Sequence, residues 1–166
     1  MRKTMIAATA MLACGGVGQA QGTSAWAYFE SDGAPLQAGL VSPDGGQLIL
    51  KCDEPGSRSV FAVIVAPQAL RPSTDRPQVR SLWLRWDGGN REELRWRYYD
   101  TSVMALNTSR DRNLPPFLTD MADADTLEVR FDPADGQPFS INFTVTGARD
   151  AVARVYESCE DDNPLG

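Results

Sequence analysis

Histidine is absent from this chain of 166 residues, and lysine and cysteine are scarce. Without histidine the chain can build neither a Ser-His-Asp triad nor a Cys-His pair, and the usual zinc sites lose their common ligand. Lys51 is the one lysine after residue 3, and no Ser-x-x-Lys motif contains it. Carboxylate chemistry, a Ser-Lys pair or a calcium site made of oxygen ligands remain open. Because the sequence singles out no catalytic residue, metal ligand set or cofactor motif, we predict a non-enzymatic protein without metal or cofactor.

Positive charge is in deficit. The chain has 16 basic and 22 acidic residues. A binder of nucleic acid needs a basic face that displaces counterions from phosphates, so the composition argues against that class. The basic residues after residue 20 are arginines except for Lys51. Long apolar runs are also missing after residue 20, which argues against a membrane-spanning segment there.

The N-terminus has the pattern of an export signal. Arg2 and Lys3 precede a mostly apolar run at residues 4–13, and Gly18-Gln19-Ala20 fits a small-x-small cleavage site. We therefore predict a signal peptide at residues 1–20, a short leader at 21–25, and a mature protein that is periplasmic or secreted. An alternative is a lipobox at residues 11–14, in which Cys14 is lipidated and anchors the protein to a membrane.

The remaining two cysteines, Cys52 and Cys159, lie at the end of a predicted strand and of a predicted helix. An exported chain meets an oxidising compartment, where two thiols usually form a structural disulfide. A Cys52–Cys159 bond would close a loop of 107 residues. Chain entropy makes such a bond worth about 4–5 kcal/mol of stability.

Alternating apolar residues predict a chain made mostly of strands in hairpin order. The expected strands are residues 26–30, 36–41, 47–52, 59–66, 79–87, 92–100, 103–107, 127–131 and 139–146. Short helical patterns cover residues 117–122 and 148–159, and the second has a continuous apolar stripe that ends at Cys159. We predict a mainly β (α+β) domain at residues 26–159, an antiparallel sheet or β-sandwich with a C-terminal helix packed on it, followed by an acidic flexible tail at 160–166.

The clearest hairpin contains the candidate binding surface. Its two strands flank Gly88-Gly89-Asn90-Arg91, and period two places six core candidates on one face. These six are Leu82, Leu84, Trp86, Leu94, Trp96 and Tyr98. The opposite face would carry Trp83, Arg85, Arg95, Arg97 and Tyr99. Arginine stacked on aromatic rings can bind glycans or a partner protein, and Trp, Tyr and Arg are common at interface hot spots.

Four alternatives stay open. The face could be covered by a second sheet or a loop, with its arginines paired to Asp87, Asp100 or Glu93. Asp120, Asp123, Asp125 and Glu128 could form a calcium site, although wet loops are often acidic without any ligand. Two carboxylates could hydrolyse envelope polysaccharide, but no pair stands out. The loop at residues 70–78, braced by Pro72 and Pro77, could inhibit a secreted hydrolase.

Several motifs together resemble a known family. They are Leu48-x-Leu50-x-Cys52, Arg85-x-Asp87-Gly88, Trp96, Phe117-Leu118, Ala124-x-x-Leu127 and the closing Phe143-x-Val145-x-Gly147-x-x-x-Ala151-Val152-x-x-Val155-x-x-x-Cys159. This pattern is similar to the periplasmic accessory proteins of bacterial type VI secretion, the VasI/TagO-type domain. A weaker similarity is to the invasion-associated locus B proteins. The first resemblance implies a disulfide-closed, β-rich periplasmic domain without an assigned reaction.

The sequence therefore predicts an exported envelope protein that serves as a binding or assembly module. The resemblance implies that it is an accessory protein of a secretion system. The expected partner is an envelope protein or a glycan.

Overall fold

The computed structural model describes residues 26–166, except residues 32, 73–75 and 109. The predicted signal peptide, the leader and Cys14 lie outside the described residues. The strands are β1 Ala27–Ser31, β2 Ala34–Val41, β3 Gln47–Cys52, β4 Val60–Val65, β5 Gln78–Trp86, β6 Arg91–Tyr98, β7 Ser102–Ala105, β8 Thr126–Phe131 and β9 Phe139–Thr144. The helices are α1 Leu114–Asp123 and α2 Ala148–Ser158.

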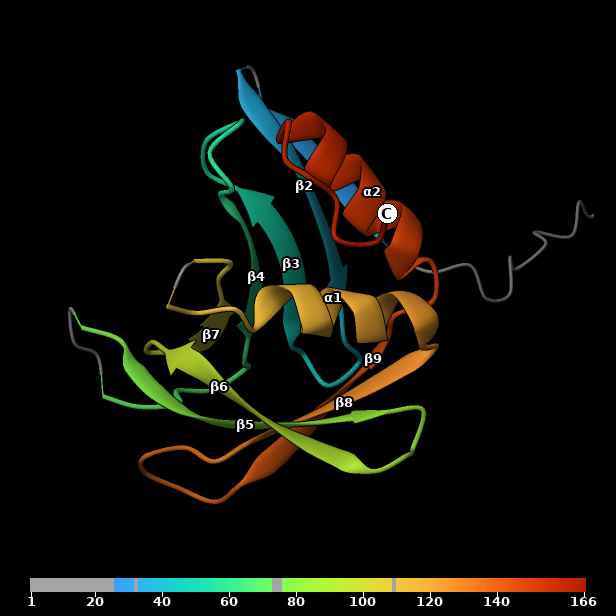
Figure 1. Cartoon of the computed structure of the whole chain (residues 1–166). Helices are drawn as coiled ribbons and strands as arrows, with labels where there is room; N and C mark the ends of the chain where they lie inside the picture. The colour runs from blue at the N-terminus through green and yellow to red at the C-terminus, as the bar shows by residue number, and fades with distance from the viewer. Residues whose placement is uncertain (1–25, 32, 73–75, 109) are drawn as a thin grey trace, which may run out of the picture.

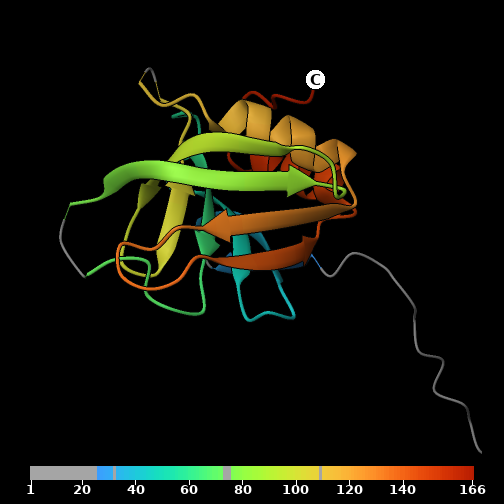
Figure 2. The same ribbon diagram turned by 90° about the horizontal axis from the view of Figure 1, so that it is seen from below.

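All the strands belong to one sheet, in the order β1-β2-β3-β4-β7-β6-β5-β8-β9. Every neighbouring pair is antiparallel. The sheet curls, so that β5, β6, β8 and β9 run across the direction of β2, β3 and β4 (Figures 1 and 2). The structure confirms the prediction of a mainly β fold. Of the two predicted arrangements, it is the antiparallel sheet with a C-terminal helix.

The curl brings one edge of the sheet against a distant turn. The hydroxyl of Ser42, in the turn after β2, donates to the carbonyl of Asn142 in β9 at 2.6 Å. The backbone N–H of Asn142 donates to the carboxylate of Asp44 at 2.9 Å. Side chains of the β2–β3 turn thus satisfy polar groups at the edge strand β9, which would otherwise offer a template for another strand.

The six core candidates of the hairpin lie on the inner face of the curl. Leu82, Leu84, Trp96 and Tyr98 are fully buried, and Trp86 and Leu94 pack partly buried against the same core. Helix α1 covers this face (Figure 1). Phe117 of α1 meets the ring of Trp96 edge-on, with 4.9 Å between ring centroids, and lies 5.6 Å from the ring of Trp86. Each fully buried aromatic side chain of this kind contributes roughly 1.5–3 kcal/mol.

Helix α1 is longer than the predicted residues 117–122. Pro115 and Pro116 were expected to precede it but lie in its first turn. Proline is tolerated there because the first backbone N–H groups of a helix have no partner within the helix. The helix ends at Asp123, and Ala124 returns to an extended conformation before β8.

Helix α2 begins after Gly147, whose φ of 85° suits glycine because it has no Cβ. Its predicted apolar stripe faces the core through Ala148, Ala151, Val152, Val155 and Tyr156. Neither α1 nor α2 in the described part of the chain is long and apolar enough to cross a membrane.

The predicted disulfide is present. Cys52, the last residue of β3, bonds to Cys159, the C-cap of α2, with 5.9 Å between their Cα atoms. Both side chains are buried, at 5% and 0% exposed. A persistent buried disulfide is typical of chains that fold in an oxidising, exported compartment.

The acidic tail makes contacts that its composition does not reveal. The carboxylate of Asp161 accepts the backbone N–H of Arg58 at 2.8 Å and that of Val60 at 3.4 Å. Leu165 is partly buried against the core. These contacts attach residues 160–166 to the start of β4 and to the body of the domain.

A candidate arginine-rich binding surface

The outer face of the β5–β6 hairpin, predicted as one binding surface, is divided in the structure. Arg85 lies at the β8–β9 side, whereas Arg95 and Arg97 lie beside residues 110–113, which lead into α1. The two groups of arginines line different hollows on the protein surface. The predicted arginines therefore share the outer face of the hairpin by register but do not line a single hollow.

Arg85 lies in a hollow of about 440 Å³ between the β2–β3 turn, β8 and β9. Its Nη1 is 3.3 Å from the carboxylate of Glu128, which is directly opposite on β8. Glu128 also accepts the hydroxyl of Ser140 at 2.9 Å. Arg85 thus has a carboxylate partner on the neighbouring strand.

The two aromatic candidates are separated as well. Trp83 is partly buried, at a register position between Glu93 of β6 and Arg130 of β8. Tyr99 follows the end of β6, where its backbone N–H donates to the carbonyl of Ser102 at 2.8 Å in the turn to β7. Neither residue lines the hollow that contains Arg95 and Arg97.

That second hollow, which we call the arginine groove, has a volume of about 600 Å³. It is lined by Val79, Glu93, Leu94, Arg95, Arg97, Arg110, Asp111, Arg112 and Asn113. Four arginines from two separate parts of the chain therefore surround one hollow. Arg95, Arg110 and Arg112 are exposed, and their side chains have no ion-pair partner among the described residues.

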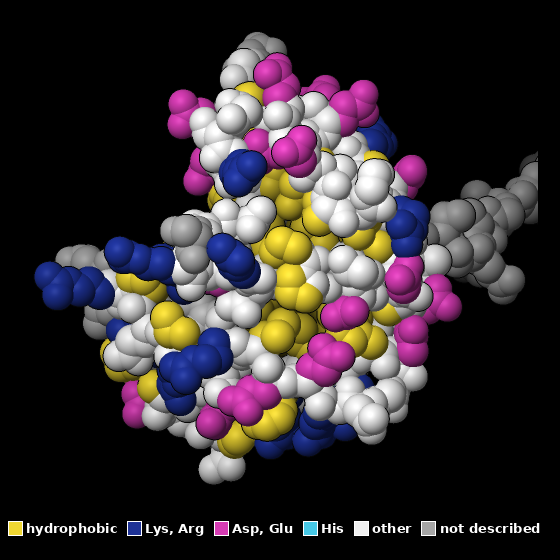
Figure 3. All heavy atoms as spheres, viewed as in Figure 1, with side chains coloured by type: hydrophobic (Ala, Val, Ile, Leu, Met, Phe, Trp, Pro, Cys, Tyr) yellow, Lys and Arg dark blue, Asp and Glu magenta, His cyan; other side chains and the backbone are white. Residues whose placement is uncertain are grey.

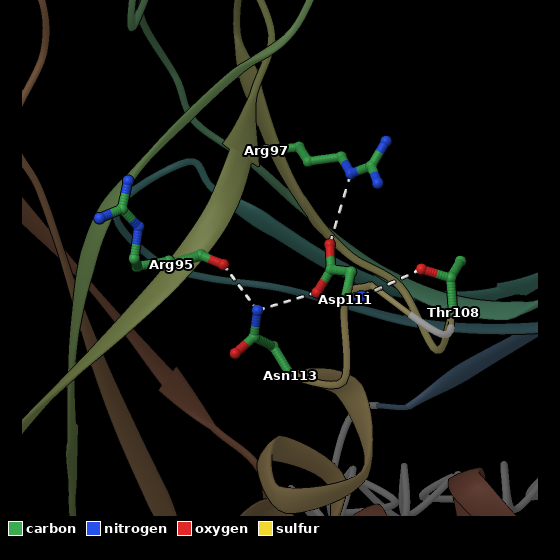
Figure 4. Close-up of polar contacts among 5 residues, drawn as sticks. All are labelled: Arg95, Arg97, Thr108, Asp111 and Asn113. Atoms are coloured by element: carbon green, nitrogen blue, oxygen red, sulfur yellow. Dashed lines mark hydrogen bonds and ion pairs between the residues drawn. The ribbon is translucent and has the colours of Figure 1, made fainter.

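A hydrogen-bond network joins Asp111 and Asn113 to β6 and to Thr108 (Figure 4). The Nε of Arg97 donates to Oδ2 of Asp111 at 3.3 Å, and Nδ2 of Asn113 donates to Oδ1 of the same carboxylate at 2.8 Å. The amide of Asn113 also donates to the carbonyl of Arg95 at 2.7 Å. The backbone N–H of Asp111 donates to the hydroxyl of Thr108 at 3.1 Å. Asp111 is only 9% exposed, so this carboxylate is an internal part of the groove.

The charges are unevenly distributed over the molecule. In Figure 3, basic side chains gather on the left, over the hairpin and the segment before α1, whereas acidic side chains surround α2 and the right-hand end of the sheet. The groove therefore lies on the basic side of a protein whose formal net charge is −6. Such a field attracts anionic partners over distances of about a Debye length, roughly 8 Å at physiological salt.

The alternative ion pairs predicted for the arginines, with Asp87, Asp100 or Glu93, are wrong. Arg85 pairs with Glu128 and Arg97 pairs with Asp111. The carboxylate of Asp87 instead accepts the backbone N–H groups of Asp125 and Thr126, at 3.0 and 2.8 Å, and these hydrogen bonds hold its pKa below the ordinary value. The partners come from distant segments, which hairpin register alone could not reveal.

The four acidic residues considered for calcium face different partners. Asp123 pairs with Arg149, Glu128 with Arg85, and Asp125 accepts the hydroxyl of Thr146 at 3.2 Å. Burial and the nearby charges of Glu92 and Asp123 raise the pKa of Asp120. Within the part of the chain that the structure describes, no three metal-binding side chains group together. The inhibitor loop at residues 70–78 includes residues 73–75, which lie outside the described residues.

Arg110 and Arg112 also line the groove, although neither was among the predicted site residues. One signal was present: the spacing Arg-x-Arg occurs both at residues 95–97 and at residues 110–112. Nothing in the sequence shows that the two segments meet, because the contact between them is made through Asp111 and Asn113.

Comparisons of the chain with protein-family models, with curated proteins and with solved structures found no match. The similarity to the VasI/TagO-type domain thus remains an expectation from the sequence.

Proposed function

We propose that this protein is an exported, non-enzymatic binding module of the bacterial envelope, and that it recognises an anionic partner through the arginine groove. The observation that carries the proposal is that four arginines surround one hollow, and only Arg97 has a carboxylate partner among the described residues. Grouping like charges is unfavourable unless a ligand or a counter-charge balances them.

The disulfide and the N-terminal sequence support the proposed location. A buried Cys52–Cys159 bond supports folding in an oxidising compartment. The sequence at residues 1–20 has the charge, apolar run and small residues of a secretory signal. A periplasmic or secreted location is consistent with both features, and an accessory role in secretion remains the narrower possibility that the resemblance implies.

The experiment compares two charge-reversed variants in a capture of partners from native envelopes. The groove variant carries Arg95→Glu and Arg112→Glu, and the control carries Arg58→Glu and Arg91→Glu. All four arginines are exposed, and Arg58 and Arg91 lie outside the groove. Both variants change the net charge equally, so nonspecific electrostatics are matched.

We expect the wild type and the control to retain the same defined component, and the groove variant to lose it. Circular dichroism and thermal unfolding of all three proteins establish that the fold is intact. Equal retention by the groove variant would remove the groove from the function. Turnover of peptidoglycan or envelope glycan by the purified wild type would contradict a non-enzymatic role.

A further inference from the structure

The chemistry of the groove narrows the class of its partner. Arg95 and Arg97 extend from β6, and Arg110 and Arg112 extend from the segment before α1. The arginines that line the hollow therefore come from two segments of the chain. A ligand in the hollow can contact guanidinium groups from both segments.

Asp111 prepares one of these arginines for a ligand. Of the three guanidinium nitrogens of Arg97, only Nε donates to the carboxylate of Asp111. Figure 4 shows the two terminal nitrogens of Arg97 pointing past Asp111, and the guanidinium of Arg95 turned away from the segment that carries Asp111 and Asn113. The terminal nitrogens of a guanidinium form a planar fork that fits two oxygens of one carboxylate or phosphate. Because Arg97 is already held in place, less side-chain entropy is lost when a second anion binds.

The groove is not uniformly basic. Val79 is 53% exposed in it. Glu93 also lines the groove, and it accepts a hydrogen bond from the hydroxyl of Ser81. A polysaccharide with an acid on every unit would bring negative charge against Glu93 and leave Val79 facing water. A peptide can alternate acidic and apolar side chains. It can therefore place carboxylates at the arginines, an apolar side chain at Val79 and no carboxylate at Glu93.

We infer that the arginine groove binds an acidic segment of a partner protein, in which carboxylate side chains flank an aliphatic residue. This inference rests on the proposed function and specifies its ligand. The carboxylates pair with Arg95, Arg112 and the open fork of Arg97. The aliphatic side chain packs on Val79.

The test uses arrayed peptides of roughly ten residues, each with several Asp or Glu residues. Half of the set has a central Leu, Ile or Val, and the other half has Ser at the same position. Affinities of selected peptides are measured by fluorescence anisotropy with the mature protein. Polygalacturonate is the comparison probe, because it is an anionic polysaccharide without an apolar side chain. Four proteins are compared: the wild type, Arg95→Glu with Arg112→Glu, Arg58→Glu with Arg91→Glu, and Val79→Asn.

We expect the aliphatic peptides to bind the wild type and the control equally, and the groove variant at least about tenfold more weakly, with the affinity falling as salt rises. Replacing the central aliphatic residue by Ser should weaken binding several-fold to the wild type and have little effect on the Val79→Asn protein. This coupling between peptide position and Val79 is not expected from charge alone.

Three outcomes would overturn the inference. Polygalacturonate binding as tightly as the best peptide would identify a glycan ligand. Equal binding of the aliphatic and Ser peptides would show attraction by charge only. Failure of every peptide to bind would exclude an acidic peptide segment. In each case, the proposed function still holds if the wild type captures an envelope component and the groove variant does not. If the wild type and the groove variant capture the same components, the proposed function and this inference are both wrong.

Discussion

Cys52 and Cys159 join the end of β3 to the end of α2 across 107 residues of sequence. The bond attaches the C-terminal helix to the half of the sheet formed by the N-terminal strands. Since β3 pairs with β2 and β4, and α2 packs on β2 and β3, the covalent link reinforces contacts that the folded protein already makes.

Removing this bond should destabilise the protein. The double change Cys52→Ala with Cys159→Ala enlarges the conformational freedom of the unfolded chain, and the expected loss is up to about 4–5 kcal/mol. Urea unfolding of the oxidised wild type, the reduced wild type and the double variant measures it. Both disulfide-free forms should unfold at similarly lower denaturant concentrations, and the double variant should be obtained in lower yield when it is exported. Equal stability of all three would refute a structural role for the bond.

Gly46 allows the β2–β3 turn to approach β9. A Cβ at this position would lie 2.8 Å from Cδ1 and 2.9 Å from Cγ2 of Ile141, which is fully buried. Gly46→Ala should therefore cost about 1–3 kcal/mol, as expected for overpacking in a core. Thermal unfolding measures the change.

A second substitution tests this steric explanation. Ile141→Val removes Cδ1 and should recover part of the stability lost in Gly46→Ala, although Ile141→Val alone should be slightly destabilising. Additive losses in the double variant would show that the contact between these two residues is not the cause.

The carboxylate of Asp87 should make the stability depend on pH at the acidic end. Its pKa is lowered, first by the hydrogen bond from the backbone of Thr126. A lowered pKa in the folded protein means that the carboxylate stabilises the fold fully above the ordinary value of 3.8, and that this contribution disappears as pH falls further toward the folded pKa.

Asp87→Asn removes the titrating group. Asparagine tolerates the positive φ of 46° at this position, so the substitution adds no backbone strain that could change the stability. We expect the variant to be less stable than the wild type at pH 7 and pH 5, and the difference to shrink below pH 3.8. A difference that stays constant down to pH 2.5 would contradict a contribution from the ionised carboxylate.

Asp161 should contribute to stability although it lies in the acidic tail. It accepts two backbone N–H groups at the start of β4, so Asp161→Ala should cost about 0.5–1.5 kcal/mol. Asp162→Ala is the matched control, because Asp162 is exposed one residue later. Urea unfolding compares the two. If both variants are equally stable, the contacts of Asp161 do not stabilise the domain, and the tail is independent of it.

Much of the fold could be predicted from alternation and apolar stripes. The period of two placed Leu82, Leu84, Trp96 and Tyr98 in the core, and the period of 3.6 placed Cys159 on the buried side of α2. These features are local, because a side chain's face depends on its position in its own strand or helix. The extent of α1 was less predictable, since proline can either precede a helix or begin it.

The candidate site was predictable only in part. Strand register places Arg85, Arg95 and Arg97 on one face of the hairpin, as predicted, but Arg85 lines a different hollow, beside β8. Sheet order is a long-range property. Strand β5 lies between β6 and β8, although Asp87, just after β5, and Thr126, the first residue of β8, are 39 positions apart in the sequence.

The amino-acid sequence by itself determined the strands, the apolar faces and the two cysteines available for a disulfide, because these follow from residue type and local spacing. Only the tertiary structure decided which strands are neighbours and which charges meet. The arginine groove arises because Asp111 and Asn113 bind to β6 across more than ten residues of intervening chain, and such contacts depend on how the whole sheet curls.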